Sequence, residues 1–230
     1  MRQLLIVLVL LYSATSLADD SAQLKEANFD AQVRAGAQPM ERKGQIVLTY
    51  LWADIYAAAL YTRPGTNPQQ AFDEQRELRL ELFYLRDLKH SDITNACATI
   101  LKRQQPATTL AKLDTPLKEL QASFGDIKRG DRYALDYNPQ RGLNLERNGT
   151  VIFTSQNHQL AKTYLGIWLA PEGLPDKLRL DLLAQRLYPA RVATTNVAYI
   201  ICYTYGYKTV LHHGAGHDLA VWTSKNTDYA

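Results

Sequence analysis

The stretch Tyr50-Leu-Trp-Ala-Asp-Ile-Tyr-Ala-Ala-Ala-Leu-Tyr-Thr-Arg-Pro-Gly65 decides the fold, because it is compatible with two kinds of secondary structure. Its alanine run, Ala57-Ala-Ala-Leu60, has high helix propensity. Its tyrosines and tryptophan instead favour a strand, one face of which could line a cavity. The neighbouring segments therefore have to decide between a helix and a strand.

These neighbouring segments predict an antiparallel sheet. Residues 77–84 alternate charged and apolar side chains, which predicts a half-buried strand with Leu78, Leu80 and Leu82 inward. Further strands are expected over 132–137, 142–147 and 150–154, and Asn148-Gly149 is a strong hairpin signal. A meander of this kind favours a long strand over residues 45–62, followed by a turn at 63–68.

Helical spacing of apolar residues appears in separate blocks of the chain. It predicts helices around 91–101, 110–124, 160–168 and 175–187. We expect Ser91-Asp92 to cap the first helix, Pro116 to kink or divide the second, and Pro175 to open the last. Because strands and helices do not alternate as βαβ units, the predicted class is α+β, with helices packed on a sheet.

Composition excludes some functions and fits an ordinary globular domain. Of the 230 residues, 46% are apolar and 21% charged, and the net charge is +3. Lysines and arginines are scattered and form no stripe interleaved with aromatic residues, so we expect no nucleic-acid partner. The length fits one domain, or one domain with a tail; the oligomeric state is left open.

The N-terminus has the pattern of a secretory signal peptide over residues 1–18. Arg2 precedes the apolar run Leu4–Tyr12, and Ser16-Leu-Ala18 places small residues at the cleavage positions. The run is too short to span roughly 30 Å of hydrocarbon, so we expect cleavage and no stable membrane insertion afterwards. The expected compartment is the bacterial periplasm.

Three further segments follow the signal. Residues 19–43 are predicted to be an extended lead-in with little core, residues 44–188 the main domain, and residues 189–230 a tail that forms a final strand pair or lacks order. In the tail, His212-His213-Gly-Ala-Gly-His217-Asp218 has metal-ligand residue types, but its spacing matches no established zinc site, so no metal or cofactor is expected. Cys97 and Cys202 could pair after export, or Cys97 could be a buried thiol.

Several motifs, taken in order, resemble the bacterial chalcone isomerase-like proteins over about residues 40–187. They are Tyr56-Ala-Ala-Ala-Leu-Tyr61, Leu80-Glu-Leu-Phe-Tyr-Leu-Arg86, Lys128-Arg-Gly-Asp131, Tyr137-Asn-Pro-Gln-Arg-Gly142 and Ile167-Trp-Leu-Ala170. The resemblance implies an open-faced β-sandwich, in which a long antiparallel sheet carries helices on one face with a ligand cleft between them. It also requires a strand in the opening stretch.

The resemblance implies two functions for comparison. The plant enzymes cyclise chalcones with Tyr, Thr and Asn side chains, whereas other members bind fatty acids through an Arg and a Tyr. Aligning the motifs places Ile93, Ile100 and Ile152 at the isomerases' Tyr, Asn and Thr positions. Apolar residues cannot stabilise a developing enolate by hydrogen bonds. The chain is therefore expected to lack isomerase activity.

The same alignment places Tyr56 where the fatty-acid binders contact the carboxylate. The family's arginine falls at Thr49 or near Arg42-Lys43, and Arg86 is a second candidate counter-charge. If residues 45–62 form one strand, Tyr50 and Trp52 share a face with Tyr56 and would border an apolar tail.

The leading hypothesis is an exported, non-catalytic protein that binds a small amphipathic ligand, such as a fatty acid, in a cleft between sheet and helices. Two alternatives remain open: an enzyme of isomerase or lyase type with a rearranged active site, and an envelope protein-interaction module that uses its sheet or its tail.

Overall fold

The computed structural model describes residues 15–36, 38–184, 199–204, 207–213 and 219–225. The chain divides into two units, Met1–Arg186 and Leu187–Ala230. In the second unit, three antiparallel strands pair in the order β10-β9-β8. These strands are β8 (Tyr199–Thr204), β9 (Tyr207–His213) and β10 (Leu219–Lys225). His212 and His213 end β9, whereas His217 and Asp218 of the histidine-rich cluster lie outside the described residues.

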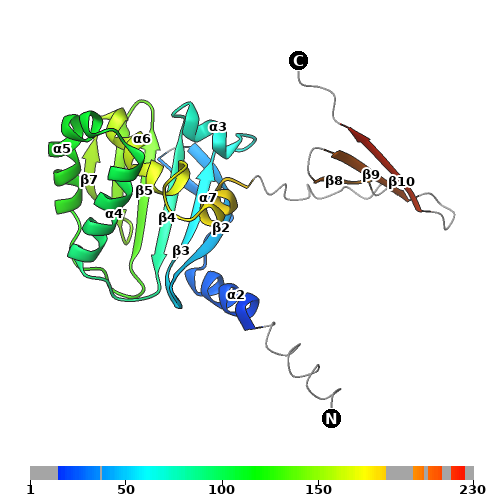
Figure 1. Ribbon diagram of the computed structural model, residues 1–230, viewed down its shortest axis with the longest axis horizontal. Coiled ribbons are helices and arrows are strands. Elements are labelled where there is room, and N and C mark those ends of the chain that lie inside the picture. The colour runs from blue at the N-terminus through cyan, green and yellow to red at the C-terminus, as the bar shows by residue number, and fades with distance from the viewer. Residues whose placement is uncertain (1–14, 37, 185–198, 205–206, 214–218, 226–230) are drawn as a thin grey trace, which may run out of the picture. The chain divides into compact units, whose positions relative to one another are not determined.

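The first unit is built on a curled sheet of seven antiparallel strands in chain order, shown in Figure 1. Each strand pairs with the next one along the chain, so the whole sheet is a meander. This confirms the predicted α+β class and antiparallel sheet. The strands are β1 (Gln32–Ala35), β2 (Gln38–Tyr50), β3 (Ala53–Thr62), β4 (Leu78–Tyr84), β5 (Arg132–Asn138), β6 (Gly142–Arg147) and β7 (Thr150–Ser155).

The stretch 50–65 is extended over its alanines, which confirms the strand and excludes the helix. The prediction of one strand over 45–62 is nevertheless wrong. Strand β2 ends at Tyr50, and β3 starts at Ala53 as its antiparallel partner. Leu51 reverses the chain with a positive φ of 48°. Leucine rarely adopts this conformation, and the turn has no glycine, asparagine or proline to announce it.

The segment 19–43 is folded into the first unit, so its description as an extended lead-in with little core is wrong. It forms most of helix α2 (Thr15–Ala27), strand β1 and the beginning of β2. Ala27, Phe29, Ala35 and Met40 are buried in an apolar cluster with the β3 face that carries Ala57, Ala59 and Tyr61. Polar residues separate these apolar residues in the sequence, so no apolar period could be recognised there.

The remaining helices lie mainly over the other face of the sheet (Figure 1). Helix α5 continues through Pro116, so this proline does not divide it. Its leucines Leu113, Leu117 and Leu120 are buried against the core. Helix α4 begins at His90, so Ser91-Asp92 is not its cap. The helices are α3 (Pro68–Asp73), α4 (His90–Gln104), α5 (Ala107–Ala122), α6 (His158–Leu169) and α7 (Asp176–Leu183). Among the described helices, none is long and apolar enough to cross a bilayer.

Alternation along the strands separates the two faces. Leu78, Leu80 and Leu82 point into the helix-covered core, as predicted. The Asn148-Gly149 hairpin is also confirmed, and both residues have positive φ, 51° and 81°. A few tight turns therefore fix the strand register, and the register decides which side chains lie on each face of the sheet.

We expect Gly44→Ala to destabilise the first unit. A Cβ at Gly44 would lie 2.1 Å from the carbonyl oxygen of Asp181 and 2.6 Å from that of Leu182, both backbone atoms of α7. Helix α7 would have to move off β2, which should lower the free energy of unfolding by about 2 kcal/mol or more. Urea denaturation would measure it.

Gly125→Ala is the matched control, because an added Cβ there meets no atom within 4 Å. It should change the free energy of unfolding by less than about 0.5 kcal/mol. Equal urea midpoints for the two variants would mean that α7 does not pack on β2 at Gly44.

Candidate functional site

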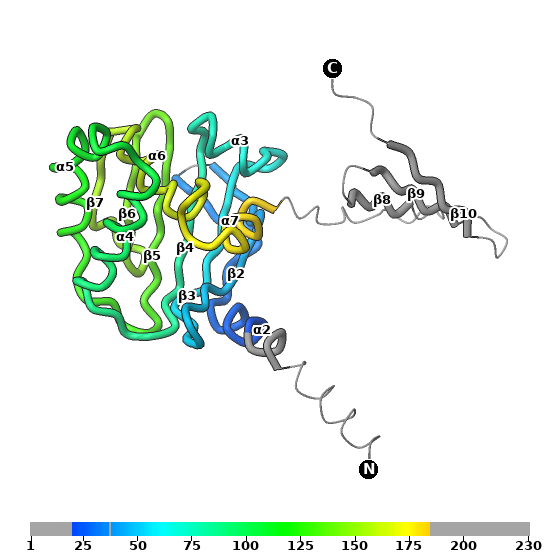
Figure 2. The backbone as a smooth tube through the Cα atoms, viewed as in Figure 1, coloured from blue at the N-terminus to red at the C-terminus, as the bar shows by residue number. Residues whose placement is uncertain are grey.

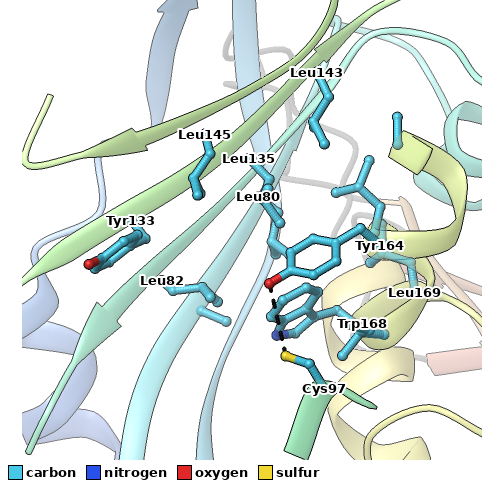
Figure 3. Close-up of a cluster of buried hydrophobic side chains, with 14 of the residues drawn as sticks. Leu80, Leu82, Cys97, Tyr133, Leu135, Leu143, Leu145, Tyr164, Trp168 and Leu169 are labelled. Carbon is cyan, nitrogen blue, oxygen red and sulfur yellow. Dashed lines mark hydrogen bonds between the residues drawn. The ribbon is translucent and has the colours of Figure 1, made fainter. Parts of the chain in front are cut away.

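A cavity of about 40 Å³ lies between the sheet and the helices that cover it. Its walls come from β4, β5 and β6 on one side and from α4, α6 and the segment after α5 on the other. Figure 3 shows Tyr164 and Trp168 of α6 facing the leucines of these strands. The lining residues are Leu80, Leu82, Tyr84, Ile93, Cys97, Phe124, Ile127, Tyr133, Leu135, Leu145, Tyr164 and Trp168.

The lining of this cavity is apolar and aromatic, and it includes no carboxylate, imidazole or amine. Burial raises the pKa of the Tyr84 and Tyr164 phenols well above their ordinary value. Burial also raises the pKa of the Cys97 thiol to about 11, although Tyr164 lies within weak hydrogen-bond distance at 3.9 Å. At neutral pH the lining is therefore uncharged and offers no thiolate nucleophile.

Tyr56 lies behind the cavity wall and does not line the cavity. Its hydroxyl accepts a hydrogen bond from Trp168 Nε1 at 2.9 Å, and both side chains are buried. Its ring meets Tyr84 edge to face, with 5.5 Å between centroids. Burial raises the pKa of the Tyr56 phenol well above its ordinary value. Tyr56 thus positions Trp168, which does line the cavity.

Tyr133 is a polar group of the cavity that sequence reasoning missed. Its side chain is buried, and its hydroxyl has no hydrogen-bond partner in the described part of the chain. Its ring stacks edge to face on Tyr84, at 5.7 Å, and on Phe124, at 6.4 Å. Strand alternation with Leu135 would have placed it on the core face, but not beside a cavity.

Tyr50 and Trp52 do not share a strand face with Tyr56, so that inference is wrong. Tyr50 is the last residue of β2, and Trp52 lies in the turn before β3. Their side chains are 67% and 89% exposed, and neither lines the cavity. The error follows directly from the missed reversal at Leu51.

The two candidate arginines occupy different places. Arg42 donates to the carbonyl oxygen of Phe29 and lies near Tyr61, on the sheet face opposite Tyr56. The structure therefore does not bring Arg42 and Tyr56 together. Arg86 is exposed in the loop directly after β4, two residues beyond the cavity residue Tyr84.

The residues aligned with the isomerases' polar side chains are apolar in three different environments. Ile93 lines the cavity, Ile100 is buried on α4, and Ile152 is half-buried on β7. None of them can donate a hydrogen bond to a substrate oxygen. Among the described residues, no cluster of three or more His, Cys, Asp or Glu side chains could hold a metal ion.

The opposite sheet face carries paired charges. Arg79 donates to Glu81 at 2.8 Å and to Glu146 at 2.7 Å, and Arg132 donates to Glu81 at 3.2 Å. Charges that are paired in this way mainly fix side-chain geometry. The uncharged cavity is thus confined to the helix-covered face.

The comparisons with known proteins agree with this architecture. A model of the chalcone isomerase-like family matches residues 21–184. Among solved structures, the fatty-acid binding protein AtFAP1 of Arabidopsis thaliana is similar, with a TM-score of 0.50 and 16% sequence identity; the match covers 67% of this chain and 90% of that one. At this identity the likeness shows the fold alone. No curated protein matches the chain.

The hydrogen bond between Trp168 and Tyr56 gives a prediction. Tyr56→Phe leaves the Trp168 N–H buried without an acceptor, so the free energy of unfolding should fall by about 1–3 kcal/mol. Tyr133→Phe is the matched control, because it removes a buried hydroxyl that has no described partner and should be neutral or stabilising. Urea denaturation compares them, and a larger loss for Tyr133→Phe would contradict the assignment.

Proposed function

Because this chain belongs to the chalcone isomerase-like family, we propose that it is a non-catalytic protein that binds a small amphipathic ligand, such as a fatty acid, between its sheet and its helices. The observation that carries this proposal is the uncharged aromatic cavity between β4–β6 and α4 and α6. Support also comes from AtFAP1, a fatty-acid binding protein of the same fold.

The lining decides how such a ligand would lie. An ionised head group buried among apolar side chains would lose its hydration without compensation. The apolar tail would therefore occupy the cavity and the head group would remain at the protein surface. Of the two candidate arginines, Arg86 is the better counter-charge, because Arg42 lies on the opposite face.

The size of the cavity adds a requirement. About 40 Å³ accommodates a few water molecules or a short piece of an alkyl chain, whereas ligand pockets usually have some 300–1,000 Å³. A long chain would need a wall to move. Helix α4 is the wall best able to do so, since it buries only Cys97, Ile100 and Leu101 and has no side-chain N-cap.

The lining also supports a role without catalysis. It contributes tyrosines and one thiol whose pKa values are all raised by burial, so it supplies neither a general base nor a nucleophile near neutral pH. This agrees with the apolar residues at the three positions aligned with the isomerases' polar side chains.

We further propose that the protein is exported to the periplasm. The support is the basic, apolar and small-residue pattern of residues 1–18.

Cavity-filling and cavity-enlarging variants of Cys97 test the ligand proposal. Cys97→Leu adds side-chain volume inside the cavity and should weaken palmitate binding about tenfold or more, measured by isothermal titration calorimetry. Cys97→Ala leaves the space open and should bind at least as well as wild type. Native mass spectrometry of the purified protein should find a bound lipid. If no lipid co-purifies and palmitate produces no binding heat, the proposal is wrong.

Export has its own test. After expression in a bacterial host, the intact mass of protein released from the periplasm should correspond to a chain that begins at Asp19. A cytoplasmic protein that retains residues 1–18 would contradict export and leave the ligand proposal unaffected.

A further inference from the structure

The β2–β3 turn exposes three consecutive large apolar side chains. Tyr50 is 67% exposed, Leu51 65% and Trp52 89%, and these three are the most exposed of the large hydrophobic residues in the described part of the chain. None of them lines the cavity. We call these three residues the aromatic turn. They belong to neither apolar cluster of the described residues, so their exposure has no structural purpose in that part of the chain.

The aromatic turn is held in place at its base. Thr49 Oγ1 donates to Asp54 Oδ1 at 2.7 Å, and Gln23 Nε2 of α2 donates to Asp54 Oδ2 at 3.2 Å. Leu51 has a positive φ of 48°, a conformation unfavourable to leucine. A strained, exposed leucine between two exposed aromatic residues is a typical mark of a functional surface.

We propose that the aromatic turn docks the protein on the surface of a lipid bilayer. Tryptophan and tyrosine prefer the membrane–water interface, where the ring is buried and the polar N–H or O–H remains hydrated. Leu51 would enter the apolar layer between them. Three side chains are too small an area for a stable protein interface, which needs roughly 800 Å² from each partner. A bilayer requires no matching surface.

A cation lies at the same end of the sheet. The Leu85 N–H donates to the Ile55 carbonyl oxygen at 3.0 Å, so Arg86 follows directly beside the first residues of β3. Arg86 is exposed and pairs with no acid in the described ranges, whereas Asp87 is bonded to Lys128. A free guanidinium beside the aromatic turn favours anionic lipid head groups.

The described part of helix α2 lies at the same end of the sheet. Helix α2 begins at Thr15 and contacts Asp54 through Gln23, eight residues and about 12 Å further along the helix. Figure 2 shows α2 and the turn between β2 and β3 at one end of the sheet.

Fluorescence of Trp52 provides a direct test with the full chain. Wild type and Trp52→Phe would be mixed with phosphatidylcholine–phosphatidylglycerol vesicles that carry brominated acyl chains. Trp168 and Trp222 are present in both proteins, so the difference spectrum isolates Trp52. We expect brominated lipid to quench most of this Trp52 emission. This readout reports the turn itself, even if residues 1–18 are retained.

Binding measurements complete the test. These measurements use protein that begins at Asp19. A Tyr50→Ser and Leu51→Ser double variant should bind the vesicles about tenfold more weakly than wild type. The control Val151→Ser changes an exposed apolar residue on β7 and should bind as wild type does. The proposal is overturned if brominated lipid leaves Trp52 emission unchanged while aqueous iodide quenches it, or if the double variant binds as tightly as wild type. Protection of Trp52 from both quenchers would indicate that another copy of the chain, the only protein in the mixture, covers the turn, and would also overturn it.

The proposal does not depend on the cavity. Loss of vesicle docking would leave palmitate binding to be judged separately by calorimetry, and absence of palmitate binding would leave the vesicle result unaffected.

Discussion

Strand β3 is buried on both of its faces, and the arrangement of the first unit follows from this burial. Every residue from Tyr56 to Thr62 is buried, so both faces of the strand must be covered by other parts of the chain. Tyr56, Ala58 and Leu60 belong to the core beneath the helices, whereas Ala57, Ala59 and Tyr61 belong to the cluster formed with α2 and Phe29. The alanines are small, which lets both covers approach the strand closely.

The two faces of the sheet are packed with different kinds of side chain. The helix-covered face is apolar, and its aromatic rings meet edge to face, which leaves a small space where they do not fill the volume. The other face combines a small apolar cluster with the charges paired around Arg79. Among the described residues, the uncharged space lies on the first face. The direction in which strand side chains point therefore separates the cavity lining from the charged face.

Much of the sheet could be predicted because it depends on local signals. The alternation of Leu78, Leu80 and Leu82 has period two, and Asn148-Gly149 has the residues that its turn requires. The reversal at Leu51 could not be predicted, because a leucine was placed in a conformation that normally selects glycine or asparagine. That one error placed Tyr50 and Trp52 on the wrong surface.

The candidate site was less predictable than the fold. Tyr56 was identified by resemblance, but its bond to Trp168 depends on residues 112 positions apart in the chain. The segment before residue 43 looked too polar to contribute core, although Phe29 and Met40 are buried against β3. Tyr133 had no distinguishing sequence signal, because the space beside it results from several helices and strands meeting.

Cys97 has a consequence for the dynamics of this fold. The thiol forms no disulfide with any described side chain and is buried on α4, the cavity wall that buries the fewest side chains relative to its length. An alkylating reagent can reach it only when α4 separates from the sheet, so its rate of modification measures how often the fold opens. Peptide mapping distinguishes this thiol from Cys202. Cys97 therefore reports on this opening. A hydrophobic molecule that holds α4 away from the sheet would raise the rate of alkylation, and one that holds α4 against the sheet would lower it.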